Sequence, residues 1–279
     1  MKYLLLPLIA LFTACQSEEP VPSVSPVSLA ITRFDTDYDQ LPEASIATSP
    51  DSSVLAQYIN PTTRYTHAIL GDAIEAGGLV VYHNEQYLQL NLTTDYVFED
   101  IVPRLVDVTA DGIPEVVCIR TQLSRGAGLV IYQIAADTLI EYAYVTEIGR
   151  SSRWLNPAAI YDLDGNGNLD IAWVQTPHIG GILKIAEIAP GELVPTAEFT
   201  GVSNHGLNQR NQCLSALVQV DGDVQLLLSS QARDRINWLT YGNNEISVAS
   251  DSMMEVDFNV PFYDQLPGFD FLIDRNCLF

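Results

Sequence analysis

Residues 162 to 170 read Asp-Leu-Asp-Gly-Asn-Gly-Asn-Leu-Asp and stand between two apolar runs. Side-chain oxygens recur at alternate positions of this stretch, on Asp162, Asp164, Asn166, Asn168 and Asp170. The two glycines between them permit a tight turn. Because Ca²⁺ prefers about six to eight oxygen ligands, a turn that gathers alternate side chains around one point predicts a calcium-binding loop.

This stretch also shares features with an EF-hand, which needs Gly at the sixth loop position and a bidentate Glu at the twelfth. Gly167 meets the first condition, but the twelfth position is Trp173 and the flanks are rich in strand-forming residues. The loop is therefore expected to join two strands. A metal-free hairpin is the remaining alternative, since Asp-Gly and Asn-Gly are ordinary turn dipeptides. The carboxylates favour a metal, because unit charges about 4 Å apart repel by roughly 1 to 4 kcal/mol.

A weaker copy of the pattern lies upstream, where residues 107 to 115 read Asp-Val-Thr-Ala-Asp-Gly-Ile-Pro-Glu. The candidate ligands occupy positions one, three, five, seven and nine and are Asp107, Thr109, Asp111, Ile113 and Glu115. A threonine replaces a carboxylate at position three, and Pro114 stiffens the exit from the loop. Position twelve is Cys118, so this copy is not an EF-hand either. Calcium binding and a metal-free turn both stay open for this loop.

Both loops resemble the calcium loops of FG-GAP and VCBS repeats, which form the blades of integrin-α-type β-propellers and of many secreted bacterial proteins. The resemblance rests on Asp-x-Asp-Gly-Asn-Gly-x-x-Asp at residues 162 to 170 and on its eroded form at residues 107 to 115. It implies a propeller fold and structural Ca²⁺. It does not imply one particular activity.

A repeated third-strand signal supports a propeller. The signal recurs about every 50 to 55 residues, a spacing that suits one four-stranded blade. Its copies are Gly78-Leu-Val-Val-Tyr, Gly128-Leu-Val-Ile-Tyr, Gly181-Ile-Leu-Lys-Ile and Ile236-Asn-Trp-Leu-Thr. The two clearest blades are expected to contain strands 104–109, 114–122, 128–135 and 139–148, then 158–163, 169–177, 181–189 and 192–199.

A fourth unit starts at Ser215, but its turn is only Asp221-Gly-Asp223, too short to hold a cation. Tyr-Asp-Gln-Leu-Pro occurs at residues 38 to 42 and again at residues 263 to 267. We interpret both copies as parts of a closing unit in which strands from the two termini pair, since ring closure removes exposed strand edges. The prediction is an all-β propeller of about five four-stranded blades. A β-sandwich with two calcium hairpins is the alternative.

Composition places the folded part in one domain, residues 31–279. The chain has 279 residues, 47% of them hydrophobic and 17% charged, which suits a single all-β core. Acidic residues outnumber basic ones 35 to 13, and the net charge is −22. Such a surface repels nucleic acid and attracts divalent cations.

The N-terminus has the layout of an export signal. Met-Lys-Tyr precedes an apolar run that ends at Phe12, and Thr-Ala-Cys15 follows. Leu-Phe-Thr-Ala-Cys resembles the lipobox of bacterial lipoproteins, which implies a signal peptide at residues 1–14 and lipidation of Cys15. Residues 15–30 then form a proline- and serine-rich tether. Gln16 favours an outer-membrane lipoprotein, facing either the periplasm or the outside. A plain secretory signal is the alternative.

Three further cysteines are expected to behave differently from one another. Cys118 lies in an apolar strand and is expected to be a buried small hydrophobe. Cys213 and Cys277 stand in similar polar contexts, and an export signal implies an oxidising compartment. We predict a disulfide between Cys213 and Cys277, although sequence alone does not fix the pairing.

The resembled family places its calcium loops between the first and second strands of a blade. The other loops then lie on the opposite face, and here they hold many of the arginines. We predict a ligand-binding mouth on that face, beside His205, formed by Arg125, Arg150, Arg153, Trp154, His178, Arg210, Arg233 and Arg235. Trp154 is expected to be its stacking surface. Guanidinium groups suit carboxylate, sulfate or phosphate, so the expected partner is an acidic glycan or an acidic protein loop. Alternatively, each arginine pairs with a neighbouring acid as rim structure.

Sequence signatures of catalysis are missing. The chain contains no Gly-x-Ser-x-Gly elbow, His-Glu-x-x-His pair, phosphate loop or dinucleotide fingerprint. Trp173 and Trp238 fall on strands and are expected to be core residues. We therefore predict a non-catalytic, calcium-stabilised envelope lipoprotein that acts as a binding or adhesion module. The alternatives are a carbohydrate-active enzyme, since some calcium propellers are polysaccharide lyases, and a periplasmic assembly scaffold.

Overall fold

A computed structural model describes residue 41, residues 45–266 and residues 268–272. The predicted signal peptide, lipidated Cys15, tether and Cys277 lie outside these residues, as does most of the terminal motif at residues 38 to 42. The described part is all-β apart from one short helix. It contains no helix long and apolar enough to cross a bilayer.

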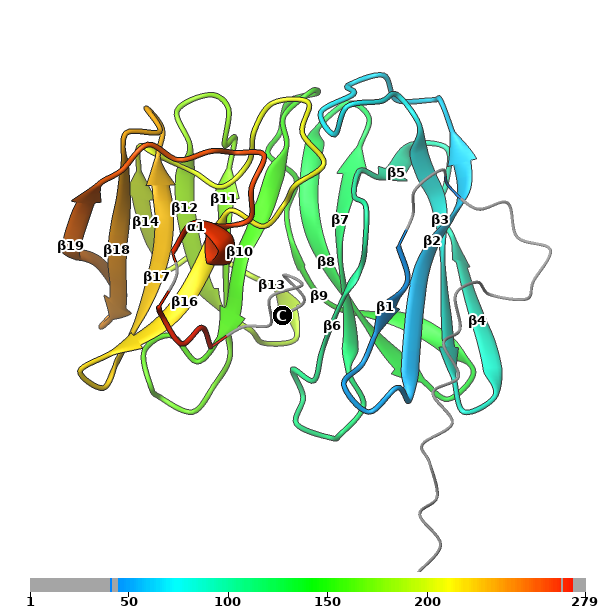
Figure 1. The fold of residues 1–279 in the computed structure, drawn as a ribbon. Coiled ribbons are helices and arrows are strands. Elements are labelled where there is room, and N and C mark those ends of the chain that lie inside the picture. The colour runs from blue at the N-terminus through cyan, green and yellow to red at the C-terminus, as the bar shows by residue number, and fades with distance from the viewer. Residues whose placement is uncertain (1–40, 42–44, 267, 273–279) are drawn as a thin grey trace, which may run out of the picture. The chain divides into compact units, whose positions relative to one another are not determined.

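Four antiparallel meanders, each of four strands, follow one another along the chain (Figure 1). Meander 1 contains β1 (Ala47–Thr48), β2 (Val54–Thr62), β3 (Glu75–His83) and β4 (Gln86–Asn91). Meander 2 contains β6 (Arg104–Val106), β7 (Glu115–Gln122), β8 (Gly126–Ala135) and β9 (Thr138–Val145). Meander 3 contains β10 (Leu155–Tyr161), β11 (Asp170–Gln175), β12 (Ile182–Glu187) and β14 (Ala197–Thr200). Meander 4 contains β16 (Ser215–Val220), β17 (Asp223–Ser230), β18 (Arg235–Gly242) and β19 (Glu245–Met253).

Three short strands connect neighbouring elements. β5 (Tyr96–Phe98) pairs with both β3 and β7 and so joins meanders 1 and 2 into one sheet. β13 (Gly191–Glu192) pairs in parallel with β9, and β15 (Val202–Ser203) pairs with β17. These pairings tie meander 1 to meander 2, meander 2 to a strand within the span of meander 3, and the segment after meander 3 to meander 4.

The core lies between consecutive meanders, whose apolar faces pack on one another. Strands buried on both faces explain why the strand sequences are almost continuously apolar. Each of three apolar layers draws on two successive meanders, and representative members are Leu79 with Val130, Ile119 with Trp173, and Leu183 with Leu228. The predicted core residues Cys118, Trp173 and Trp238 are buried.

Glycine recurs at the third strand for a packing reason. A Cβ atom built on Gly128 would lie 2.4 Å from the carbonyl oxygen of Val145, and one on Gly181 would lie 1.7 Å from that of Val202. Gly78 is similarly placed, 2.9 Å from the carbonyl oxygen of Leu90. Side chains at these positions would push the neighbouring strand away. The repeated third-strand signal is confirmed, because β3, β8, β12 and β18 occupy its four copies.

The C-terminal copy of the terminal motif does not form the expected strand. Residues Phe262–Gln265 form the short helix α1. Phe262 is fully buried in an apolar layer with Leu227 and Ile236, so this segment covers the outer face of meander 4. The Gln265 side chain also donates to the backbone oxygen of Asp257 at 2.8 Å, which holds the chain in a local turn. The segment around Phe262 is therefore held by packing on meander 4 and not by the expected pairing of terminal strands.

The turn of meander 4 is a plain hairpin, as predicted, with Val220 paired directly to Asp223. Across the described residues the sheets stack without closing into a ring.

Candidate cation loop and ligand pocket

The 162–170 loop joins β10 to β11 and gathers its carboxylates. One oxygen from each of Asp162, Asp164 and Asp170 lies within 4.8 Å of the others. Gly165 (φ 74°) and Gly167 (φ 94°) adopt left-handed backbone conformations, which turn the alternate side chains toward one point. Within the described part of the chain, no other group of three His, Cys, Asp or Glu side chains is gathered in this way.

Hydrogen bonds position these carboxylates but do not satisfy them all. Oδ2 of Asp170 accepts the amide N–H of Leu163, and Oδ2 of Asp162 accepts that of Gly167, each at 3.0 Å. Oδ1 of Asp162 is buried and accepts no hydrogen bond from any described residue. Burial raises the pKa of Asp170 to about 7, and the neighbouring carboxylates of Asp164 and Asp162 add to the shift. A divalent cation fits this site, because it would supply a partner for the orphan oxygen and offset the repulsion.

The two asparagines of the loop are held from outside it. Their amide nitrogens both donate to Oε2 of Glu187, at the end of β12, at 3.1 Å. Oδ1 of Asn166 accepts the amide N–H of Asn168 at 2.7 Å. The three aspartates therefore form the gathered oxygen set, and Glu187 is a neighbour that the sequence pattern does not identify.

The 107–115 loop joins β6 to β7 and repeats the same backbone frame. Ala110 (φ 57°) and Gly112 (φ 86°) are left-handed at the positions that correspond to the two glycines of the other loop. Oδ2 of Asp107 accepts the amide N–H of Gly112 at 2.9 Å. Oε2 of Glu115 accepts the amide N–H of Val108 at 2.8 Å. These bonds match those of Asp162 and Asp170 position for position.

The side chains of the 107–115 loop are arranged differently. The hydroxyl of Thr109 donates to Oε1 of Glu115 at 3.2 Å, so both oxygens of this carboxylate have donors. Oδ1 of Asp111 accepts the amide N–H of Ile113 at 2.8 Å. The candidate ligands of this loop do not form a gathered group of three carboxylates, in contrast to the 162–170 loop. Hydrogen bonds within this loop already satisfy both carboxylate oxygens of Glu115, the residue at position nine.

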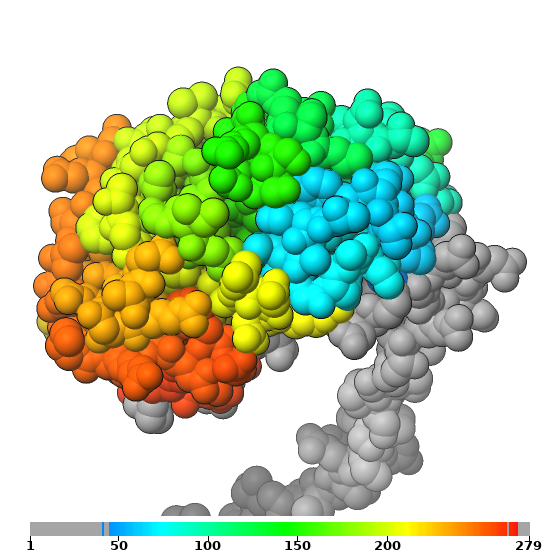
Figure 2. Space-filling model, turned by 90° about the horizontal axis from the view of Figure 1, so that it is seen from above, coloured from blue at the N-terminus to red at the C-terminus, as the bar shows by residue number. Residues whose placement is uncertain are grey.

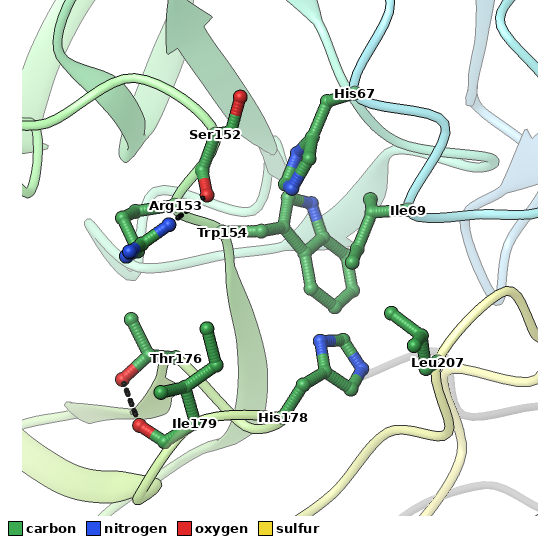
Figure 3. Close-up of a pocket in the computed structure, with 9 residues that line it drawn as sticks. All are labelled: His67, Ile69, Ser152, Arg153, Trp154, Thr176, His178, Ile179 and Leu207. Atoms are coloured by element: carbon green, nitrogen blue, oxygen red, sulfur yellow. Dashed lines mark hydrogen bonds between the residues drawn. The ribbon is translucent and has the colours of Figure 1, made fainter.

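A pocket of about 340 Å³ lies at the other end of the strands. Its lining comes from the β2–β3, β9–β10, β11–β12 and β15–β16 connections and consists of His67, Ile69, Ser152, Arg153, Trp154, Thr176, His178, Ile179 and Leu207 (Figure 3). Figure 2 looks onto this end, where the blue-cyan, green and yellow parts of the chain that carry these connections meet. Hydrogen bonds hold them together, from the amide N–H of Asn208 to the oxygen of Ile69 and from that of Ser152 to the hydroxyl of Tyr65.

Trp154 forms a wall of this pocket rather than an exposed platform. Its side chain is only 2% exposed, and its Nε1 donates to the backbone oxygen of Glu99 at 2.9 Å. The indole lies nearly parallel to the imidazole of His178, with ring centroids 6.2 Å apart and an interplanar angle of 11°. The expected stacking surface is therefore nearly closed to a ligand, because the indole is buried in an apolar layer and contacts His178 and His205.

His178 and His205 form a closed hydrogen-bonded pair. Nε2 of His205 lies 2.9 Å from the backbone oxygen of Gln209 and must donate to it, so Nδ1 of His205 accepts from Nε2 of His178 at 2.9 Å. Burial lowers the pKa of His178 to about 4 and that of His205 to about 3. Both imidazoles are therefore neutral at neutral pH.

A third histidine, His67, pairs with a buried acid. Its Nδ1 lies 2.6 Å from Oε1 of Glu99, whose side chain is fully buried. Burial raises the pKa of Glu99, whereas the hydrogen bonds from His67 and Thr121 oppose that shift. Neither residue belongs to a site predicted from the sequence. His67 and Glu99 lie 32 residues apart, so no local motif could have revealed the pair.

The predicted arginine mouth is only partly assembled. Arg153 lines the pocket, while Arg125 and Arg150 come from the adjoining β7–β8 and β9–β10 connections. Backbone hydrogen bonds of 2.8 Å join these connections, from Gly149 to Arg125 and from Ala127 to Arg153. Nε of Arg125 lies 3.7 Å from an oxygen of Glu147.

The other three arginines do not line this pocket, which corrects the expected single mouth. Arg210 pairs with Asp72. Arg235 pairs with Asp234 at 3.3 Å and lies 3.4 Å from Asp251, and Arg233 packs 4.1 Å above the Phe258 ring in a separate hollow. Arg210 and Arg235 pair with acids, in line with the alternative of rim structure, whereas Arg233 contacts an aromatic ring.

The cysteines follow part of the prediction. Cys118 is a free, buried thiol. Cys213 is disulfide-bonded. Cys277 lies outside the described residues, so its pairing with Cys213 stays a prediction.

No protein-family model matches the chain, and no curated protein matches it. Among solved structures, the chain is similar to the exotype rhamnogalacturonan lyase YesX, with 10% identity, a TM-score of 0.37, and coverage of 77% of this chain and 51% of that chain. It is also similar to the Bacillus licheniformis rhamnogalacturonan lyase PL11, with 10% identity, a TM-score of 0.35, and coverage of 80% and 54%. The chain spans about half the length of each of these structures.

Proposed function

We propose that this chain is a calcium-stabilised binding module that takes an acidic glycan into the pocket lined by Arg153 and Trp154. The single observation that carries the proposal is this pocket. Its volume of about 340 Å³ falls within the range of about 300 to 1,000 Å³ that is usual for small-ligand sites. A guanidinium at the rim suits a carboxylate.

Charge supports an acidic rather than a basic ligand at this end. The chain carries a net charge of −22, yet Arg125, Arg150 and Arg153 come from two connections that are hydrogen-bonded to each other. Arg150 and Arg125 are exposed. On an otherwise acidic protein, such a local group of guanidiniums attracts an anionic ligand to this end of the molecule. An acidic loop of a protein partner is the other ligand of this kind.

The proposed cation is Ca²⁺, which the aspartates of the 162–170 loop would bind. Oxygen-only ligands and three carboxylates fit a hard divalent ion. Millimolar external calcium would fill even a site with a dissociation constant of about 10⁻⁴ to 10⁻³ M. The ion would then brace the β10–β11 turn at the end of the sheet opposite the pocket.

The fold of this proposal is a β-propeller of the FG-GAP and VCBS type. Two observations support it: four-stranded meanders stack face to face in chain order, and both acidic loops connect the first and second strands of a meander.

The location of this proposal is the outer membrane, through a lipid on Cys15. The lipobox-like sequence and the proline-rich tether support it. Labelling with a clickable fatty acid tests it, because Cys15→Ser should abolish incorporation.

Binding is tested by isothermal titration with oligouronates and by a glycan array. Arg153→Ala should weaken binding at least about tenfold, since a charge-assisted hydrogen bond contributes about 1.5 to 3 kcal/mol. Arg235→Ala is the matched control, because this arginine pairs with Asp234 outside the pocket. The proposal fails when no acidic glycan binds, or when both variants weaken binding equally.

A carbohydrate-active enzyme is the second candidate, and the buried pair of His67 and Glu99 beside the pocket favours it. Imidazole–carboxylate pairs serve as proton acceptors in enzymes, whereas a pure binding site has no need of one. Turnover of a bound glycan distinguishes this candidate from the binding module.

A further inference from the structure

His67 is the pocket histidine that has a carboxylate partner. Nδ1 of His67 is bonded to Glu99, and within the described residues its Nε2 makes no hydrogen bond. The His67 side chain is 14% exposed and lines the pocket. The donors of His178 and His205 are already used within their own pair and on Gln209. His67 is therefore the pocket imidazole that combines a carboxylate partner on one nitrogen with an open second nitrogen.

The surroundings of Glu99 fix the proton on Nδ1 of His67. The hydroxyl of Thr121 donates to Oε2 of Glu99 at 2.8 Å, and Oε1 faces His67. A carboxylate whose two oxygens both accept hydrogen bonds is suited to the anionic form. Nδ1 then carries the proton, and Nε2 is left as a hydrogen-bond and proton acceptor.

The other buried acids near Glu99 are not alternative partners for His67. Asp100 forms a two-point pair with Arg104, at 2.5 and 3.2 Å. Burial raises the pKa of Glu75 to about 9, which keeps it protonated at neutral pH. The backbone around Glu99 is also fixed, since its oxygen accepts the indole N–H of Trp154 and its amide N–H donates to the oxygen of Ile119 at 3.2 Å. Glu99 is thus a rigidly held hydrogen-bond partner of His67.

We propose that His67 is the proton acceptor of an active site in this pocket, with Glu99 as its positioning residue and a uronate-containing glycan as its substrate. The proposal rests on the proposed binding of an acidic glycan. Figure 3 shows His67 and Arg153 on adjacent sides of the pocket, next to the Trp154 ring. A guanidinium that holds the sugar carboxylate would place the C–H group beside that carboxylate within the same pocket as Nε2.

The step is a β-elimination. Nε2 of His67 takes the proton from the carbon next to the carboxylate, and the electron pair of that C–H bond forms a carbon–carbon double bond. The C–O bond at the neighbouring carbon breaks, and its electron pair leaves with the glycosidic oxygen, which takes a proton from water. Arg153 stabilises the negative charge that develops on the carboxylate. No oxidant, reductant or further co-reactant is required.

The test uses the full chain with polygalacturonate, alginate and glucuronan, and it follows the ultraviolet absorbance of the unsaturated uronate. Binding of each polymer is measured in parallel. His67→Ala and His67→Gln should lower kcat by about 10²- to 10⁴-fold, the usual contribution of a general base, and leave KM little changed. His67→Gln, whose amide can still donate to Glu99, should keep the melting temperature closer to that of the parent chain than His67→Ala, which leaves the buried carboxyl without its partner. Added imidazole should restore part of the activity of His67→Ala.

Glu99→Gln tests positioning. It should lower kcat at least about tenfold and alter the pH dependence of kcat without a change in KM, because the amide no longer fixes the Nδ1 proton. His83→Asn is the matched control, since this histidine ends β3 and contacts Ser53, away from the pocket. It should leave turnover unchanged.

The outcomes separate the two proposals. Binding without any unsaturated product, or full turnover in both His67 variants, overturns the assignment of His67 and leaves the binding module intact. Absence of both binding and product overturns the proposed function and this inference together. Product formation that depends on His67 and is rescued by imidazole supports both.

Discussion

The 107–115 and 162–170 loops have the same backbone and different side chains. In each, the carboxylate at position one accepts the amide N–H of position six, and the carboxylate at position nine accepts that of position two. Left-handed residues stand at positions four and six of both loops. The turn is therefore specified by positions one, four, six and nine, independently of any cation.

What differs is the charge gathered inside the turn. Position three is Thr109 in one loop, where its hydroxyl satisfies the acid at position nine. It is Asp164 in the other, where three carboxylates converge and one oxygen of Asp162 has no partner among the described residues. The backbone hydrogen bonds therefore shape the turn in both loops. The residue at position three decides whether the turn gathers enough negative charge to hold a cation.

The largest effect is expected from position nine. Asp170→Ala leaves a buried amide N–H without its acceptor, and Glu115→Ala leaves a half-buried one, which costs about 1 to 3 kcal/mol of unfolding free energy in chelator. Calcium at a hundredfold excess over its dissociation constant should stabilise Glu115→Ala by about 2.7 kcal/mol and Asp170→Ala not at all. Urea denaturation with and without calcium measures this. Equal calcium responses would show that the loops are equivalent.

A smaller and cleaner effect is expected at position one of the 162–170 loop. Asp162→Asn keeps an oxygen that accepts the Gly167 amide but removes one negative charge and one strong ligand. The variant should be as stable as the parent chain in chelator, or slightly more stable, and should lose the calcium-dependent rise in melting temperature. Asp107→Asn is the control and should keep that rise. Loss of stability in chelator would mean that Asp162 is important for folding rather than for the cation.

A third carboxylate should give the 107–115 loop the calcium binding that we assign to the 162–170 loop. Thr109→Asp places a third carboxylate beside Asp107 and Glu115 and removes the hydroxyl donor of Glu115. In chelator the variant should lose roughly 1 kcal/mol through repulsion and the lost hydrogen bond. Calcium should restore that loss and bind with a second stoichiometric equivalent in calorimetry. Thr109→Asn, without the added charge, should gain much weaker binding.

The smallest expected effect is a pH dependence of the free energy of unfolding, seen only when chelator keeps the protein free of cations. Without a cation the pKa of Asp170 lies near 7 in the folded protein, above its ordinary value of 3.8. The folded chain then binds more protons than the unfolded chain between these values, so the free energy of unfolding falls as pH rises from about 4 to about 7. Asp170→Asn should flatten that part of the slope. An identical slope in the variant would assign the dependence to other groups, such as Glu75.

Local parts of the fold were predictable from the sequence because they depend on neighbouring residues. The strand runs, the β10–β11 turn and the plain hairpin at Asp221 follow from apolar patterning and turn chemistry within about ten residues. The third-strand glycines were visible as a repeat, although their reason, the close approach of a neighbouring carbonyl, emerges only from packing. Cys118 and Trp173 were recognisable as core by their apolar neighbours.

Features that depend on distant contacts were not predictable in this way. The C-terminal copy of Tyr-Asp-Gln-Leu-Pro is helical at Phe262–Gln265 because Phe262 packs on meander 4, which a repeated pentapeptide does not reveal. His67 and Glu99 meet only because β3 and β7 both pair with β5. Arg210, Arg233 and Arg235 were separated from Arg153 by partners close to each of them.

The most direct test of the central claim is the calcium stoichiometry of the purified chain, measured by calorimetry and by elemental analysis after dialysis. We expect one calcium ion per chain, retained in Glu115→Gln and lost in Asp162→Asn. Two ions per chain, or one ion that persists in Asp162→Asn and disappears in Glu115→Gln, would contradict the assignment of the cation to the 162–170 loop.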